Sequence, residues 1–95
     1  MIVECGDLKI DLLRAEVRRD GGQIPLSMRE YRLLLLLAQA GGELVETDVL
    51  MESLGKYYEL ENLWVLIRRL RMKMALVPGR TKVVTVSGAG YRMGG

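Results

Sequence analysis

Several residue types are scarce in this chain, and their scarcity excludes whole classes of site. The 95 residues include one cysteine and no histidine. A single cysteine, Cys5, cannot form an internal disulfide bond, which agrees with a reducing compartment. Without histidine, the chain can build neither a Cys/His zinc site nor a Cys–His nucleophilic pair. We therefore expect no bound metal, no cofactor and no catalytic site of these kinds.

Long apolar runs are absent as well. The longest run, Leu33–Ala38, is far shorter than the roughly 18–20 residues that span a bilayer, and it lies inside a helical pattern. The N-terminus lacks a charged leader followed by an apolar stretch, so we expect no signal peptide. These features predict a cytoplasmic chain without a membrane segment, and its length is typical of one domain, residues 1–95.

Acidic residues are missing from the C-terminal part of the chain. Residues 62–95 contain seven Lys or Arg and no Asp or Glu, whereas residues 1–55 contain six basic and ten acidic residues. A face of one sign is the expected footprint of polyanion binding. The alternative is a solubilising surface, but a solvated helix usually pairs opposite charges four residues apart. No acidic residue follows Glu61, which favours polyanion binding.

Residues 1–26 are predicted to form short strands joined by turns. Apolar and polar residues alternate from Leu8 to Leu12, which is typical of a half-buried strand. Asp20-Gly21-Gly22 is a hairpin turn signal between two further short strands. The segment therefore reads as a small antiparallel meander.

Three helices are predicted over residues 27–76. Ser27 and Glu30 have the spacing of a capping box, so the first helix is expected to begin there. Gly41-Gly42 ends it, and its run of leucines indicates a central helix that is covered on several sides. The second and third helices are expected at about 47–54 and 62–76.

The third helix has one apolar side and one basic side. At 100° per residue, Leu63, Leu70 and Met74 fall within about 60° of Ile67 around the helix. These four apolar residues form one stripe, which should be buried. The other side carries Asn62, Val65, Arg68, Arg69, Met72 and Lys73. An α-helix fits the major groove of B-DNA, where Asn can pair with adenine, Arg with guanine and Val with a thymine methyl. Arg and Lys can also neutralise phosphates without reading sequence.

A β-hairpin is predicted over residues 82–93, around the turn Ser87–Gly90. Its glycines are available for positive φ, and the N–H groups of Gly88 and Gly90 are expected to approach phosphates closely. The alternative is an ordinary terminal hairpin that completes a sheet, and Leu44-Val45 is expected to form a further brief strand. Hydroxyl and basic side chains surround the turn: Arg80, Lys82, Thr85, Ser87 and Arg92.

Three segments resemble the C-terminal effector domain of OmpR/PhoB-type response regulators. Residues 67–74, I-R-R-L-R-M-K-M, match the pattern I-x-x-L-R-x-K-L. Residues 85–92, T-V-S-G-A-G-Y-R, are similar to T-V-R-G-x-G-Y-R, and residues 26–34, L-S-M-R-E-Y-R-L-L, to L-T-x-R-E-F-x-L-L. Each motif alone is weak, but three in the same order across nearly the whole chain are specific.

The resemblance implies an α+β winged helix-turn-helix fold. It comprises an N-terminal four-stranded antiparallel sheet over residues 1–26, three helices over 27–76 and a C-terminal β-hairpin wing over 80–95. It also implies a non-enzymatic, sequence-specific transcription regulator of a two-component system, with the third helix in the major groove of double-stranded DNA. The expected DNA-binding residues are Asn62, Val65, Arg68, Arg69, Arg71, Lys73, Thr85, Ser87 and Arg92.

The resemblance also implies partners. We expect a homodimer on direct or inverted DNA repeats and a phosphorylatable receiver domain that is missing from this sequence. A contact with RNA polymerase is expected through the loop at residues 55–62, which looks about three residues shorter than is usual in the family.

Departures from the family pattern leave a second function open. Ser87 stands where the pattern has the wing arginine, and Trp64 and Leu66 replace Asp and His in V-D-V-H-I. Trp64 is expected to be either half-buried or an interface anchor, and Leu66 to lie on the flank of the reading face. Because Trp and Tyr favour interface hot spots, the alternative is a winged-helix protein-interaction module with weak or lost DNA binding. An enzyme is the weakest hypothesis, since the basic half has no paired carboxylates and the chain has no phosphate-cradling loop.

Overall fold

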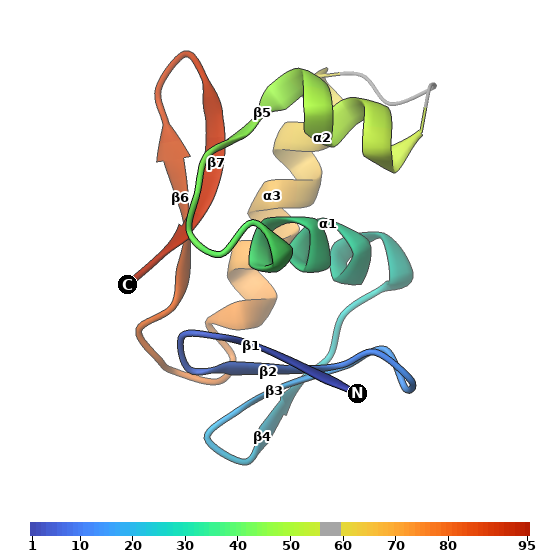
Figure 1. Ribbon diagram of the computed structural model, residues 1–95, viewed down its shortest axis with the longest axis vertical. Helices are drawn as coiled ribbons and strands as arrows, with labels where there is room; N and C mark the ends of the chain where they lie inside the picture. The colour runs from blue at the N-terminus through green and yellow to red at the C-terminus, as the bar shows by residue number, and fades with distance from the viewer. Residues whose placement is uncertain (56–59) are drawn as a thin grey trace.

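The computed structural model describes residues 1–55 and 60–95, without the side chains of residues 60 and 61. Within these residues the chain runs from a small sheet through three helices to a terminal hairpin (Figure 1). The elements are β1 (Ile2–Cys5), β2 (Leu8–Asp11), β3 (Glu16–Arg19), β4 (Gly22–Ile24), α1 (Met28–Gln39), β5 (Val45–Glu46), α2 (Thr47–Leu54), α3 (Leu60–Met74), β6 (Lys82–Val86) and β7 (Gly90–Gly94).

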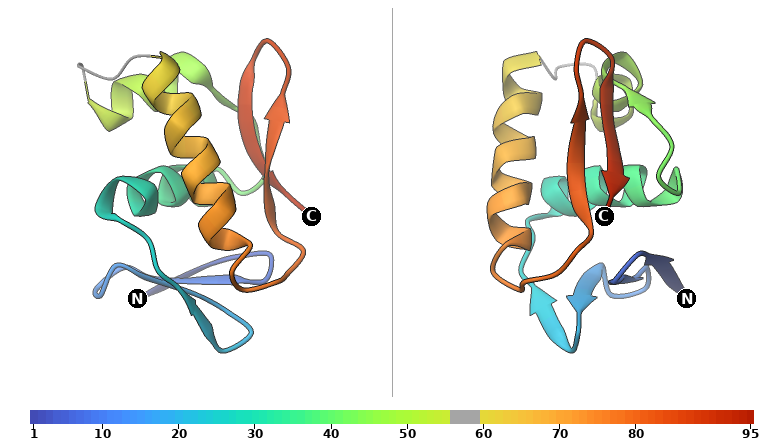
Figure 2. Two further views of the ribbon diagram at one scale, coloured as in Figure 1. Left: turned by 180° about the vertical axis from the view of Figure 1, so that it is seen from behind. Right: turned by 90° about the vertical axis from the view of Figure 1, so that its left-hand side faces the viewer.

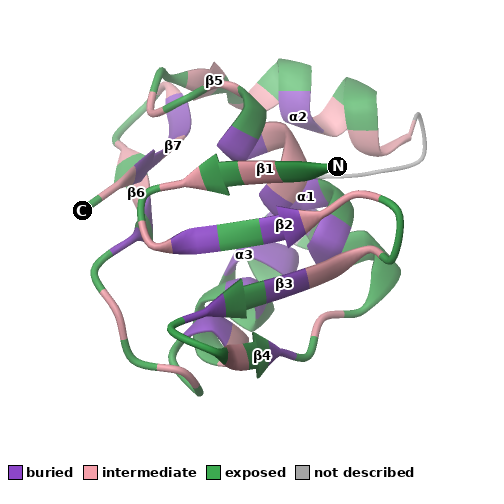
Figure 3. Ribbon diagram, turned by 60° about the horizontal axis from the view of Figure 1, so that its bottom comes forward, coloured by how far each residue is buried: buried purple, intermediate pink, exposed green. Residues whose placement is uncertain are grey.

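The N-terminal sheet has the strand order β1-β2-β3-β4, and every neighbouring pair is antiparallel. Alternation along the strands turns one row of side chains toward the helices, as the burial colours in Figure 3 show. The buried row comprises Leu8, Ile10, Val17 and Ile24. Asp20 and Gly21 turn the chain between β3 and β4 with φ of 48° and 80°, which suits the Asp-Gly hairpin turn that the sequence predicts.

Helix α1 is the centre of the molecule. Ser27 Oγ accepts from the Glu30 N–H at 3.2 Å, and Glu30 Oε1 accepts from the Ser27 N–H at 2.7 Å, so the predicted capping box is confirmed. The helix contacts β1 below it and α2, α3 and β7 on its other sides (Figure 1). Leu33, Leu34 and Leu37 are consequently fully buried, as expected for a helix that is covered on several sides.

The C-terminal hairpin belongs to a three-stranded sheet with the order β5-β7-β6. Glu46 of β5 is opposite Gly90 of β7, and a Cβ at position 90 would overlap the carbonyl oxygen of Val45. The sequence-based interpretation of this glycine was therefore wrong: Gly90 is required by the close approach of β5, and only Gly88 takes positive φ, at 76°, within the turn.

The predicted fold class is confirmed, and the differences lie at the ends of elements. Helix α3 begins at Leu60, before the predicted start at Asn62, and β4 lies at 22–24 instead of 23–26. Among the described residues, no helix combines the length and apolar character that crossing a bilayer requires.

Candidate nucleic-acid interface

Helix α3 and the hairpin lie side by side and form one face of the molecule. Seen from behind, α3 crosses in front of α1, and no described element covers its outer side (Figure 2). The hairpin stands beside the N-terminal half of α3, with β6 on the side nearer to the helix (Figure 2). A protruding helix next to a β-ribbon has the shape that enters a DNA groove.

The inner side of α3 agrees with the predicted stripe and extends beyond it. Leu63, Ile67, Leu70 and Met74 are at most 4% exposed. Leu66 is also buried, at 5% exposure, so its expected place on the flank of the reading face was wrong. Leu66 lines a hollow of about 240 Å³ beside the start of α1, because α3 packs against α1 over a wider arc than the four-residue stripe indicates.

The outer side of α3 carries the candidate residues that the sequence places there. The side chains of Asn62, Val65, Arg68 and Arg69 are all exposed. Within residues 1–55 and 62–95, neither Arg68 nor Arg69 has a hydrogen bond or an ion pair. Trp64 is 56% exposed, so its side chain is partly covered and partly accessible to a partner.

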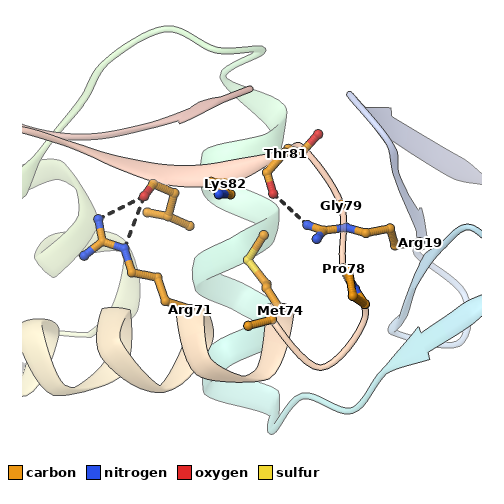
Figure 4. A pocket seen from close by; sticks show the side chains of 9 residues that line it. Arg19, Arg71, Met74, Pro78, Gly79, Thr81 and Lys82 are labelled. Carbon is orange, nitrogen blue, oxygen red and sulfur yellow. Dashed lines mark hydrogen bonds between the residues drawn. The ribbon is translucent and has the colours of Figure 1, made fainter.

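Arg71 connects α3 to the hairpin. Its Nε and Nη2 donate to the carbonyl oxygen of Val83 at 3.2 and 2.9 Å (Figure 4). Nη2 also donates to Thr85 Oγ1 at 2.8 Å. The guanidinium carbon lies 6.0 Å from the centre of the Tyr91 ring, within the range of a cation–π contact. Two predicted DNA contacts, Arg71 and Thr85, are therefore bonded to each other and fix the hairpin against the helix.

Lys73 connects the same helix to α1. Its Nζ lies 2.6 Å from Oε1 of Glu30, whose side chain is 3% exposed. Burial opposes ionisation of Glu30, but the hydrogen bonds from Lys73 and Ser27 outweigh it and lower the pKa of the carboxyl. The charge of Lys73, a predicted DNA contact, is thus largely neutralised inside the protein.

A third connection ties the N-terminal sheet to the segment between α3 and β6. Arg19 is 3% exposed, and its Nη1 and Nη2 donate to the carbonyl oxygens of Val77 and Thr81 at 2.9 and 2.6 Å. Its Nε lies 3.3 Å from Asp7 Oδ1, an ionic contact without hydrogen-bond geometry. Asp7 Oδ2 in turn accepts from the Arg80 N–H at 2.7 Å.

The pKa of Asp7 lies below its ordinary value. Burial raises it, but the N–H of Arg80, the Thr81 side chain and the charge of Arg19 together lower it further. This cluster was not predicted from the sequence, although the sequence contains a signal for it. Arg19 follows the buried Val17 by two residues, so alternation along β3 directs it inward as well.

A cavity of about 430 Å³ opens between the end of α3 and the base of β6 (Figure 4). Arg19, Arg71 and Lys82 line it together with Met74 and Pro78. Two of these three cations hold backbone carbonyls, so the cavity lies between the connections described above and is not a separate cluster of free charges.

The hairpin presents fewer groups than expected. Ser87 and Thr85 are exposed, whereas Arg92 is half-buried and donates from Nη1 to the Met93 carbonyl at 3.3 Å. Gly90 is buried beneath β5, so the expectation that its N–H approaches a phosphate was wrong. The tip is also attached to α2, since the Thr47 N–H donates to the Ala89 carbonyl at 3.1 Å.

No group of His, Cys, Asp and Glu suited to a metal ion occurs among the residues that the structure describes. The face consists instead of an exposed helix whose Arg68 and Arg69 have no partner among the described residues, supported by three polar connections behind it. This arrangement is that of a winged helix-turn-helix protein.

Comparisons with known proteins agree with this class. Residues 21–93 match a model of the family described as "Transcriptional regulatory protein, C terminal". The chain is 35% identical over 97 aligned positions to the DNA-binding response regulator MtrA of Mycolicibacterium smegmatis, covering 98% of this chain and 42% of that protein. It is 34% identical to the transcriptional regulatory protein CseB of Streptomyces coelicolor, covering 97% of this chain and 39% of that protein.

Solved structures give the same result. The DNA-binding domain of RstA from Klebsiella pneumoniae, in complex with the RstA box, has a TM-score of 0.80 at 29% identity and covers 96% of this chain and 94% of that one. The Thermotoga maritima OmpR/PhoB homologue DrrB has a TM-score of 0.83 at 30% identity, covering 99% of this chain and 44% of that one.

The chain belongs to the OmpR/PhoB-type family of C-terminal domains of transcriptional regulators. This is a family of DNA-binding effector domains and not of enzymes, as the sequence predicts. The chain spans about 42% of the length of a curated relative such as MtrA.

Proposed function

We propose that this chain binds double-stranded DNA sequence-specifically, with α3 in the major groove and the hairpin as the wing. One observation supports this most directly. Of the four cations on α3, Arg71 and Lys73 are held by the protein, whereas Arg68 and Arg69 lie on the uncovered side without a partner among the described residues. Free guanidinium groups on an exposed helix suit phosphates and guanine edges.

The proposed interface divides its residues by role. Asn62, Val65, Arg68 and Arg69 face base edges and nearby phosphates from α3. Thr85, Ser87 and Arg92 contribute from the hairpin, close to the DNA backbone. Arg71 and Lys73 lie at the edges of the interface, where their main task is to hold α3 against the hairpin and α1.

The proposal also covers the partners with which the chain would act. The RstA structure contains its DNA box, and by analogy we expect this chain, residues 1–95, to act as one DNA-binding unit. It would bind repeats as a homodimer in the cytoplasm, and a receiver domain outside this sequence would control it. Contact with RNA polymerase through residues 55–62 stays a prediction, because residues 56–59 lie outside the described part of the chain.

A salt series tests the central claim. Each phosphate contact releases counterions, so a domain with several contacts should lose orders of magnitude in affinity for duplex DNA between about 50 and 200 mM salt. Affinity is measured by fluorescence anisotropy with the 95-residue chain, and an Arg68→Ala/Arg69→Ala double variant should bind more weakly with a shallower salt slope. A matched double variant on the N-terminal sheet, Arg14→Ala/Arg18→Ala, serves as the control.

The protein-interaction alternative has its own supporting observation. Trp64 is 56% exposed on α3, and Ser87 stands where the family pattern has an arginine at the wing. A flat response to salt, with both double variants equal to the parent, would contradict DNA binding and favour this alternative.

A further inference from the structure

The outer side of α3 is unusually apolar. Val65, Met72 and Leu76 are 47%, 62% and 65% exposed. Val65 and Met72 are seven residues apart, so at 100° per residue they lie within about 20° of one another along α3, and Leu76 follows in the turn after the helix ends at Met74. Arg68 and Arg69 flank this line on opposite sides, both exposed. We call Val65, Met72 and Leu76 the apolar line.

The width and setting of the apolar line argue against a protein partner. A helix that packs against protein usually has a continuous apolar stripe at least about 100° wide. The exposed Trp64 lies about 100° from Val65 around the helix, but Arg68 lies between Trp64 and the apolar line, so the exposed apolar residues do not form such a stripe. The cores of protein interfaces are also depleted in charge, yet the line is bordered by Arg68 and Arg69, for which the described residues supply no partner. Residues 62–95 carry seven Lys or Arg and no Asp or Glu, a charge that complements a polyanion.

Thymine offers the apolar group that such a line can recognise in a polyanion. Its C5-methyl projects into the major groove, where the other three bases present hydrogen-bonding groups. Val65 and Met72 are about 10 Å apart along the helix axis, which corresponds to a few base-pair steps. The unbranched Met72 side chain can also adapt to the position of a methyl group.

We propose that the apolar line reads thymine methyl groups, so that the chain selects a thymine-rich half-site. Val65 and Met72 would contact the methyls of separate thymines, while Arg68 and Arg69 bind the neighbouring phosphates and purine edges. The inference rests on the proposed function, because it requires α3 to lie in the major groove. It adds the class of sequence that is bound and assigns Met72 a role in specificity.

Uracil substitution tests this inference directly. A duplex is first selected by this chain from a random pool, and each thymine of the half-site is then replaced singly by deoxyuracil. Uracil keeps the base-pairing edge and lacks only the methyl. Removing a contacted methyl should weaken binding about fourfold, as expected for one buried carbon. Binding is measured for the parent, Val65→Ala, Met72→Ala and, as a control, Leu13→Ala, whose side chain is 85% exposed on the N-terminal part.

The outcomes separate the two proposals. In support, Met72→Ala and Val65→Ala should each abolish the thymine–uracil difference at one position while retaining it at the other, and Leu13→Ala should behave as the parent. If the parent binds thymine and uracil duplexes equally and still prefers its selected sequence, methyl reading is wrong although DNA binding stands. If no sequence is enriched and binding is insensitive to salt, both proposals fail. Thermal unfolding checks that each variant is folded.

Discussion

Two pairs of cations on α3 show how neighbouring residues of one helix can take different roles. Arg68 and Arg69 lie on the uncovered side without partners among the described residues. Arg71 and Lys73, only a few positions further on, hold the hairpin and α1 through Val83 and Glu30. A basic helix is therefore not a uniform DNA-binding surface: its flanking cations orient the helix, and its outward cations remain available to a ligand.

The largest expected effect concerns the outward pair. Arg69→Ala should weaken binding to a selected duplex by about 1–3 kcal/mol if the side chain reads a base. Arg14→Ala is the matched control, because Arg14 is also exposed but lies in the N-terminal part. Titration of labelled duplex measures both. Equal affinity of the two variants would show that Arg69 is not on the reading face.

Arg71 and Lys73, which hold the hairpin and α1, are expected to affect the stability of the fold more directly than DNA binding. Lys73→Met leaves the Glu30 carboxylate buried without its cation, which should lower the free energy of unfolding by about 2 kcal/mol. The side chain of Lys73 is 36% exposed, so water can replace part of the contact and the loss stays below that of a fully buried pair. Urea unfolding measures it, with the exposed Lys9→Met on β2 as control. A loss no larger than that of Lys9→Met would contradict the anchoring role.

A smaller effect is expected from pH. In the folded protein, the pKa of Glu30 lies below its ordinary value of 4.5 and that of Asp7 below 3.8. At pH values between the folded and the unfolded pKa of each group, the unfolded chain therefore binds more protons than the folded protein. Their contribution is fully present above about pH 5 and is lost as the pH falls through the folded-state pKa values. We expect the unfolding free energy to decrease below pH 5, and Glu30→Gln to reduce that decrease. Identical pH profiles for parent and variant would exclude Glu30 as a source.

The smallest expected effect is a gain. Ser87 is exposed at the hairpin, where the family pattern has arginine. Ser87→Arg should add one phosphate contact, which would raise affinity for duplex DNA severalfold at low salt and steepen the dependence of binding on salt by about one. Ser53→Arg is a control of equal charge on α2. If both variants gain equally, only net charge has changed and the hairpin does not contact DNA.

The elements that were predictable from the sequence are those specified by local chemistry. Ser27 and Glu30 predict the start of α1, and Asp20-Gly21 predicts a hairpin turn. The spacing of Leu63 and Ile67 identifies the inner side of α3. Each signal acts within a few residues, where turn geometry and helix periodicity decide the outcome.

The features of the fold and of the candidate site that were not predicted from the sequence depend on contacts between distant parts of the chain. Lys73 pairs with Glu30 and Arg71 with Val83, and no local pattern shows that these cations turn inward instead of outward. Leu66 was misplaced because the arc that α1 covers is a property of helix packing and not of the α3 sequence. The role of Gly90 likewise follows from the position of β5.

The ties made by Arg19 bear on how small a working version of this protein can be. The family match begins at residue 21, yet Asp7 and Arg19 precede it and hold the chain between α3 and β6 through Val77, Arg80 and Thr81. A truncation at the edge of the matched region would remove the support beneath α3 and the hairpin, the two elements of the proposed DNA-binding face. The first three strands and the turns between them therefore support the proposed DNA-binding face, although they lie at the opposite end of the molecule.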